Sequence, residues 1–169
     1  MKLPKQLDKD GIDADVRAAL DKEQFEICSD PHISIPSFEL NSELRKYIFY
    51  AKALGELVIG YETIEKSLAS EKKGLMKVDN QSERVSRLLI VTNDGSERFY
   101  RELKYLQHKQ GGRVLICRLN VDAILMGGIL GLKERSIKAV LINRKTSVVN
   151  VLKAVLFVEK ILKLQTPNV

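Results

Sequence analysis

A glycine turn within residues 54–66 is the part of the sequence whose residue types and spacing best suit chemistry, namely the binding of phosphate. Three apolar residues at 57–59 are typical of a short strand, and Gly60 follows them directly, before an expected helix. The first N–H groups of a helix have no partner inside the helix and can donate to a phosphate oxygen. Lys66 comes near the end of the first turn and a half, where it adds a cation. The spacing therefore predicts one wall of a phosphate-binding surface.

Residues that could support catalysis are few. His32 and His108 are the only histidines, and Cys28 and Cys117 are too far apart in sequence to suggest a metal or redox motif. The sequence has no glycine-rich nucleotide loop and no nucleophile motif. Residues 93–96 follow an expected strand, where α/β enzymes often place catalytic groups, but a turn and a helix cap explain them better. We therefore predict a protein that is not an enzyme and that uses no cofactor, metal or small-molecule substrate. An enzyme with a site at 93–96 is the weaker alternative.

Charge is distributed unevenly along the 169 residues, whose net charge is +6. Residues 1–45 contain 6 Lys/Arg and 10 Asp/Glu, whereas residues 46–169 contain 22 Lys/Arg and 12 Asp/Glu. This asymmetry favours a chain of two parts, the larger of which suits a polyanionic partner. On charge alone, a solvated basic surface without such a partner explains the excess equally well.

No segment suggests a membrane or secretory destination. The longest apolar candidate, residues 123–132, is too short to span a bilayer and contains three glycines. The N-terminal residues lack the apolar region of a secretory signal. We therefore expect a cytoplasmic protein without a membrane partner.

The expected secondary structure alternates between helices and strands. Apolar runs predict four strands, at 57–59, 87–92, 113–118 and 137–142. Helices are expected to begin near residues 42, 61, 96, 121 and 146. The alternation predicts an α/β fold, specifically a three-layer α/β/α sandwich of about 120 residues around a mixed four-stranded sheet.

The N-terminal residues carry a weaker pattern. Residues 15–26 are typical of a short helix, and the prolines at 31 and 36 favour an extended segment between them. Residues 75–86 are polar, lack a clear period and are expected to form a loop. We predict an acidic appendage at 1–42 and a basic α/β/α domain at 43–165.

The sequence from Tyr47 to about Ile142 resembles the kink-turn-binding ribosomal proteins of the archaeal "L-seven-Ae" type and their bacterial paralogues. Residues 51–60 resemble the family's opening, "A-x-x-A-G-x-L-V-x-G", and Gly60 with Lys66 resembles its glycine turn followed by a lysine six residues on. Later matches, in the family's order, lie at residues 88–94, 114–117, 122–127 and 131–135. The resemblance implies a ribosomal-protein-like fold and a domain that binds RNA.

The whole chain also resembles a bacterial two-domain protein in which a small YlxR-type domain precedes this fold. Residues 14–46 resemble the C-terminal part of that first domain, whereas its usual N-terminal core is missing. Residues 1–42 are therefore interpreted as the remnant of a YlxR-like domain.

The resemblance implies non-enzymatic binding of structured, bent or kink-turn-like RNA, from the ribosome or associated with it. The implied contacts come from the glycine turn, from the turn after the next strand and from the loop before the last strand: Gly60, Tyr61, Glu62, Thr63 and Lys66; Thr92, Asn93 and Asp94; and Leu132, Lys133, Glu134 and Arg135. The basic residues would meet phosphates, and Leu132 would rest against an unstacked base. Glu62 and Thr63 stand where the family has Asn-Glu, so the identity of the RNA stays open. The alternative is a protein-interaction module that keeps the fold without binding RNA.

Overall fold

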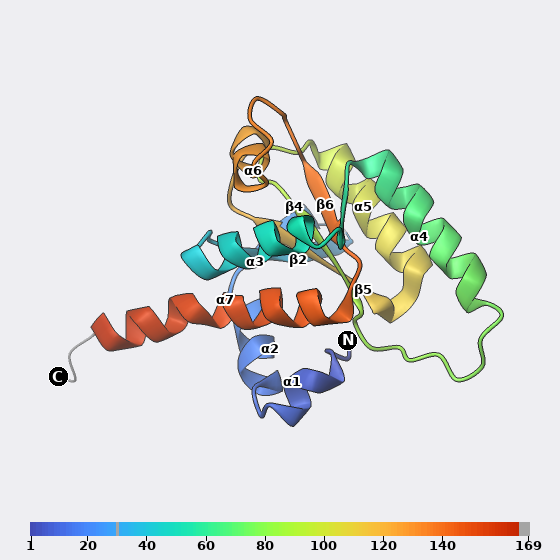
Figure 1. Cartoon of the computed structure of the whole chain (residues 1–169), viewed down its shortest axis with the longest axis horizontal. Coiled ribbons are helices and arrows are strands. Elements are labelled where there is room, and N and C mark those ends of the chain that lie inside the picture. Colours follow the sequence, from blue (N-terminus) through green and yellow to red (C-terminus); the bar gives the residue numbers. More distant parts are fainter. Residues whose placement is uncertain (30, 166–169) are drawn as a thin grey trace.

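A six-stranded mixed sheet forms the centre of the computed structural model, which describes residues 1–29 and 31–165 (Figure 1). In spatial order the strands are β1 (Gln24–Ser29), β2 (His32–Phe38), β5 (Val114–Leu119), β4 (Arg87–Val91), β6 (Ala139–Ile142) and β3 (Leu57–Ile59). Strands β2, β5 and β4 are parallel to one another, whereas β6 is antiparallel to both β4 and β3, and β1 is antiparallel to β2. The expected α/β class is therefore confirmed, and the four predicted strands lie within two residues of their expected bounds.

Seven α-helices accompany these strands in the part of the chain that the structure describes: α1 (Lys5–Lys9), α2 (Asp13–Lys22), α3 (Ser42–Ala53), α4 (Tyr61–Leu75), α5 (Glu97–Gln110), α6 (Ala123–Ile129) and α7 (Lys145–Gln165). Side chains at the predicted positions cap two of them, since Asn41 accepts from the Leu44 amide and Ser96 accepts from the Phe99 amide. Helix α4 ends at Leu75, the residue at which the predicted loop begins. None of the described helices combines the length and the apolar character needed to cross a membrane.

The sheet has six strands instead of the predicted four, because residues 24–38 form a hairpin and extend it. The predicted helix 15–26 is wrong at its end: α2 stops at Lys22, and Phe25 lies in β1. There the Phe25 ring contacts Tyr100 edge to face at 5.0 Å between centroids. Strand β2 then pairs in parallel with the end of β5, through Ser37 and Phe38. The hairpin thereby covers an edge of β5 that would otherwise be unpaired.

Helices cover both faces of the sheet. Alternate residues of β4 point to opposite sides, so that Leu88 and Ile90 join one buried cluster and Leu89 and Val91 the other. The first cluster includes side chains of α2, α3 and α7, and the second includes side chains of α4 and α5. Burial on both faces explains why the central strands are continuous apolar runs, which made them predictable.

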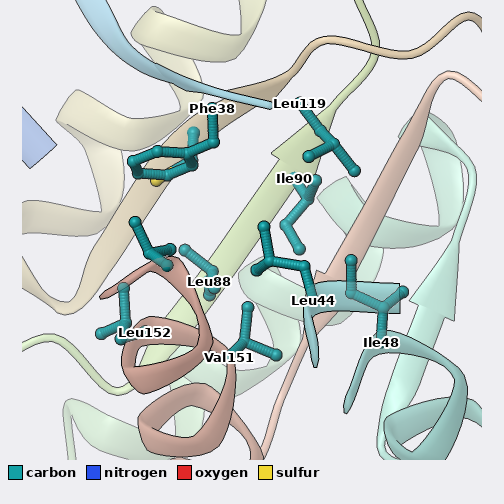
Figure 2. Close-up of a pocket in the computed structure, with 10 residues that line it drawn as sticks. Phe38, Leu44, Ile48, Leu88, Ile90, Leu119, Val151 and Leu152 are labelled. Carbon is teal, nitrogen blue, oxygen red and sulfur yellow. The ribbon is translucent and has the colours of Figure 1, made fainter. Parts of the chain in front are cut away.

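A small apolar cavity lies in the first cluster, where β2, β4, β5, α3 and α7 meet (Figure 2). Its volume is about 10 Å³, roughly the room for one water molecule. The lining is apolar throughout: Phe38, Leu44, Ile48, Leu88, Ile90, Cys117, Leu119, Val151, Leu152 and Val155. A void of this size is a packing imperfection and has no room for a ligand.

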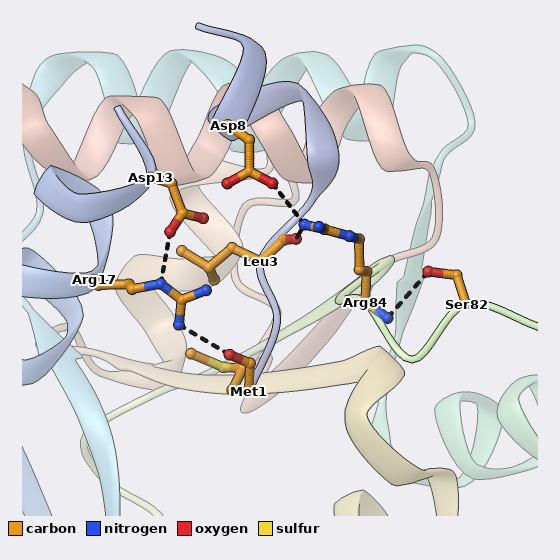
Figure 3. A network of polar contacts seen from close by, with 7 residues as sticks. All are labelled: Met1, Leu3, Asp8, Asp13, Arg17, Ser82 and Arg84. Carbon is orange, nitrogen blue, oxygen red and sulfur yellow. Dashed lines mark hydrogen bonds and ion pairs between the residues drawn. The ribbon is translucent and has the colours of Figure 1, made fainter. Parts of the chain in front are cut away.

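Residues 1–42 are built into the same core and the same sheet as the rest of the chain. Leu3 and Leu7 are fully buried in the cluster that also contains α3 and α7. Arg84 donates to the Leu3 carbonyl at 2.9 Å and to the Asp8 carboxylate at 2.8 Å (Figure 3). Arg17 donates to the Met1 carbonyl at 2.9 Å. The sheet and the core therefore continue across the predicted boundary between residues 42 and 43. The relation of residues 1–42 to a YlxR-like domain stays a prediction.

Candidate nucleic-acid interface

The three segments predicted to bind RNA meet at one edge of the sheet, where β2, β3, β4 and β5 end and β6 begins. We call it the carboxyl edge. Ile59 pairs with Val140 and Val91 with Ala139, so the turns after β3 and β4 flank the start of β6. The Gly60 amide donates to the Ala139 carbonyl at 3.1 Å. The loop from Gly131 leads through residues 136–138 into β6, which brings the third segment to the same edge.

The glycine turn has the expected shape. Gly60 is the N-cap residue of α4 and adopts a φ of 87°. A Cβ built on Gly60 would meet nothing within 4 Å, so its backbone conformation, and not lack of space, favours glycine. Glu62, Thr63 and Lys66 are exposed on the first two turns of α4, and Tyr61 is half-buried against the Phe99 ring, 6.3 Å away between centroids. The open turn and the exposed lysine are compatible with a ligand at this end of α4.

The turn after β4 is held together by its own polar groups. The Thr92 hydroxyl donates to Asp94 Oδ1 at 2.6 Å, and Asp94 Oδ2 accepts from the Ala123 amide at 3.1 Å. Tyr100 donates from its hydroxyl to the Thr92 carbonyl at 2.7 Å. Because the Thr92 side chain is completely buried, it supports the turn and offers no surface to a ligand.

Asp94 is kept ionised by this arrangement. Partial burial acts to raise the pKa of its carboxyl group, but the hydrogen bonds from Thr92 and Ala123 and the positive charge of Lys138 outweigh that effect and lower the pKa. The carboxylate thus joins the β4 turn to the start of α6. Asp94 therefore has a structural role, in agreement with the interpretation of residues 93–96 as a turn followed by a helix cap.

The third segment is a tight loop packed on α6. Leu132 is half-buried against the first core cluster, whereas Lys133, Glu134 and Arg135 are exposed. Glu134 has a φ of 63°, which is uncommon for a residue other than glycine. A Cβ built on Gly127 would lie 2.0 Å from the Arg135 carbonyl oxygen, so the loop approaches α6 as closely as a glycine permits. The loop therefore presents its charged side chains outward from a fixed backbone.

Charges at the carboxyl edge are mixed. The segments expose three cations of the predicted site, Lys66, Lys133 and Arg135, whose side chains make no hydrogen bond or ion pair among the described residues. Lys138, just before β6, adds a fourth exposed cation that the sequence reasoning missed. Carboxylates share the edge: Glu62, Asp94 and Glu134 lie in the same three segments, and the exposed Asp122 lies at the start of α6. The cations are thus available to phosphate, but the carboxylates restrict where a phosphate can approach.

A polar network that sequence reasoning also missed continues along this edge. Asn120 donates to Glu39 Oε1 at 2.6 Å and accepts from the Asn93 side-chain amide at 2.8 Å. These residues follow the ends of β2, β5 and β4, which lie side by side. The sequence predicts a helix start near residue 121, but α6 begins at Ala123 and is capped by Asp122, which accepts from the Leu125 amide. Without β2 in the expected sheet, the sequence contained no signal that Glu39 lies beside Asn120.

Comparisons with known proteins inform the fold. No protein-family model matches the sequence, and no curated protein is significantly similar to it. Among solved structures, the chain is similar to a Bacillus halodurans protein of unknown function, with a TM-score of 0.51 and 11% sequence identity over 68% of this chain and 98% of that one. At so low an identity, the likeness concerns the fold alone.

Proposed function

We propose that this chain is a non-enzymatic, cytoplasmic RNA-binding protein that holds structured RNA at the carboxyl edge. The observation that carries the proposal is the convergence there of three segments with Lys66, Lys133 and Arg135, none of them ion-paired in the described structure. Exposed, unpaired cations release counterions when they meet phosphates, which supplies much of the affinity for RNA. The RNA would be ribosomal or ribosome-associated, and the fold a ribosomal-protein-like α/β/α sandwich with a YlxR-like remnant at 1–42.

In the proposed complex, each segment has a distinct task. The Gly60 turn lets a phosphate approach the first amides of α4, and Lys66 contacts a neighbouring phosphate. Lys133 and Arg135 hold the backbone on the other side of the β4 turn. Glu62 can accept a hydrogen bond from a guanine amino group while repelling phosphate, so it favours a base edge near the start of α4. Bent RNA suits such a surface because it presents phosphates and base edges together.

The polar groups of residues 92–96 support a non-enzymatic role. Thr92 and Asp94 hold the turn, Asn93 is bonded to Asn120, and Ser96 caps α5 by accepting from the Phe99 amide at 3.2 Å. Each side chain with reactive potential is thus engaged in local structure. A general base instead needs a pKa near the working pH, whereas the pKa of Asp94 is lowered.

An electrophoretic mobility shift with a kink-turn RNA and an unbent duplex of equal length tests the proposal. Stronger binding to the bent RNA is expected, because the three segments would contact both arms of the bend. Equal, weak binding to both RNAs with a steep salt dependence would show that the interaction is electrostatic and does not distinguish bent from unbent RNA. No binding of either RNA at low salt would overturn the proposal.

A protein-interaction module is the second candidate, and exposed apolar side chains on α3, at its C-terminal end and on α6 favour it. The exposed side chains there are Phe49, Tyr50, Leu54, Ile124 and Leu125. Beside Phe49 lies a hollow of about 310 Å³, lined also by Arg45, Lys46 and Ile129. Exposed apolar groups of this kind are common at protein interfaces. If this surface carries the function, substitutions at the carboxyl edge will be neutral and RNA will not bind.

A further inference from the structure

A basic groove lies at the opposite end of the sheet, where β4 and β5 begin and β6 leads into α7. Its volume is about 1040 Å³. Six cationic residues line it, from five separate parts of the chain: Lys5, Arg84, Arg87, Arg113, Lys145 and Lys153. Asp10 is the one carboxylate among the described lining residues. We call this feature the basic groove.

The walls of the groove are fixed to each other. Helix α1 supplies one wall and the loop after α4 supplies another, and Arg84 joins them through its bonds to Leu3 and Asp8 (Figure 3). The Val85 amide also donates to the Lys2 carbonyl at 2.8 Å, within a short parallel bridge between Lys2 and Arg84. A ligand would thus enter a groove that is already formed, which lowers the entropic cost of binding.

Two of the arginines are held in place by one carboxylate. Arg87 and Arg113 both donate to Glu71 Oε2, at 2.9 and 2.7 Å. Arg113 donates further to Gln110 Oε1 at 2.6 Å, and only 9% of its surface is exposed. One carboxylate cannot neutralise two guanidinium groups, so this pair keeps a net positive charge and a defined position.

The remaining charges also leave an excess of positive charge. Arg84 is paired with Asp8, and Lys153 with Asp10 at 2.5 Å. Lys5 and Lys145 are exposed, and neither forms a hydrogen bond or ion pair with its side chain in the described structure. Six cations therefore stand against three carboxylates. Lys145 also begins the 21-residue helix α7, whose positive dipole end adds to the potential in the groove.

The lining indicates which part of a ligand is recognised. None of the described lining residues is aromatic, so the groove offers no ring on which a base could stack. Guanidinium groups and lysines bind phosphate oxygens by charge-assisted hydrogen bonds. We infer that the basic groove is a phosphate-binding site, separate from the carboxyl edge. The phosphates belong either to an RNA strand that also contacts the edge or to a free phosphorylated ligand.

The test uses the full chain and two probes, tripolyphosphate by isothermal titration calorimetry and a structured RNA by fluorescence anisotropy. The groove variant is Lys5→Gln with Lys145→Gln, since both side chains are exposed and unpaired and their loss spares the fold. Its matched control is Lys52→Gln with Lys73→Gln, which removes the same charge outside the groove. The edge variant, Lys66→Ala with Arg135→Ala, reports separately on the proposed RNA site.

We expect saturable binding of tripolyphosphate that is weakened about tenfold or more in the groove variant and unchanged in the control and edge variants. Amide NMR signals of residues 84–87 and 145–147 should shift on addition of tripolyphosphate. If RNA affinity also falls in the groove variant but not in the control, the phosphates come from RNA. If only tripolyphosphate binding falls, the ligand is a free phosphorylated molecule.

The inference is overturned if tripolyphosphate does not bind, or if the groove and control variants lose affinity equally for both probes. The proposed function fails on different results. It fails if RNA does not bind the unmodified protein, or if the edge variant binds RNA as well as the unmodified protein does. The tripolyphosphate titration is informative in either case, because it does not require RNA.

Discussion

The hydroxyl of Thr92 donates to the carboxylate of Asp94 at 2.6 Å, and through that carboxylate the turn after β4 is joined to the start of α6. The bond fixes the centre of the carboxyl edge, between the glycine turn of α4 and the loop before β6. Two residues predicted to contact RNA are therefore first of all the supports of the site. Their substitution should change stability before it changes recognition.

Replacing Asp94 with asparagine should destabilise the fold by about 0.5 kcal/mol at neutral pH, a small amount because solvent screens this exposed carboxylate. The pKa of Asp94 is lowered from 3.8 in the folded protein, so its contribution is present above pH 3.8 and is lost as the pH falls through the folded-state pKa. Urea unfolding at several pH values measures this. The difference between Asp94→Asn and the unmodified protein should shrink below pH 3.8, whereas Asp79→Asn in the exposed loop should have no effect at any pH. A constant difference across pH would contradict the ionic role.

Gly127→Ala should destabilise the protein by about 2 kcal/mol or more, because its new Cβ would lie 2.0 Å from the backbone oxygen of Arg135. The loop that carries Lys133 and Arg135 would have to move. Gly128→Ala is the matched control, since a Cβ there meets nothing within 4 Å and alanine favours the helix. Thermal unfolding of the two variants should therefore differ clearly in midpoint. Equal midpoints would show that the loop does not pack on α6 in this way.

The two cysteines should react very differently with a thiol reagent. Cys117 is buried beside the small core cavity, and burial raises the pKa of its thiol far above the ordinary value, so the reactive thiolate is scarce. Cys28 is half-buried at the sheet margin. In native protein at pH 8, Cys28→Ser should abolish labelling by dithionitrobenzoate, and denaturant should restore one reactive thiol. Rapid labelling of Cys117 in the native Cys28→Ser variant would contradict the described packing.

Much of the fold could be predicted because its central strands are buried on both faces. Leu88–Val91 and the other apolar runs stand out against their polar flanks, and Gly60 and Ser96 mark where the following helices begin. The hairpin of β1 and β2 could not be found in this way. It is short, contains Pro36, and pairs with β5 through Ser37 and Phe38, whose partners lie some eighty positions later.

The candidate sites show the same contrast. The carboxyl edge could be anticipated because each of its segments follows or precedes a predicted strand. Lys138 and Glu39 were missed because they have no local motif and are placed by the register of β6 and β2. The basic groove could not be predicted from the sequence, because long-range contacts of the fold bring Lys5, Arg84 and Lys153 together and no local periodicity indicates those contacts.

The salt dependence of RNA binding tests the central claim most directly. Affinity for a kink-turn RNA should be measured by anisotropy between about 50 and 200 mM salt, for the unmodified protein, Lys66→Ala with Arg135→Ala, and the control Lys52→Ala with Lys73→Ala. Each lost phosphate contact lowers the slope of log affinity against log salt by about 1. We predict a slope reduced by about 2 in the edge variant and little changed in the control, with both variants folded by circular dichroism. An edge variant whose affinity and slope match the unmodified protein would contradict RNA binding at the carboxyl edge.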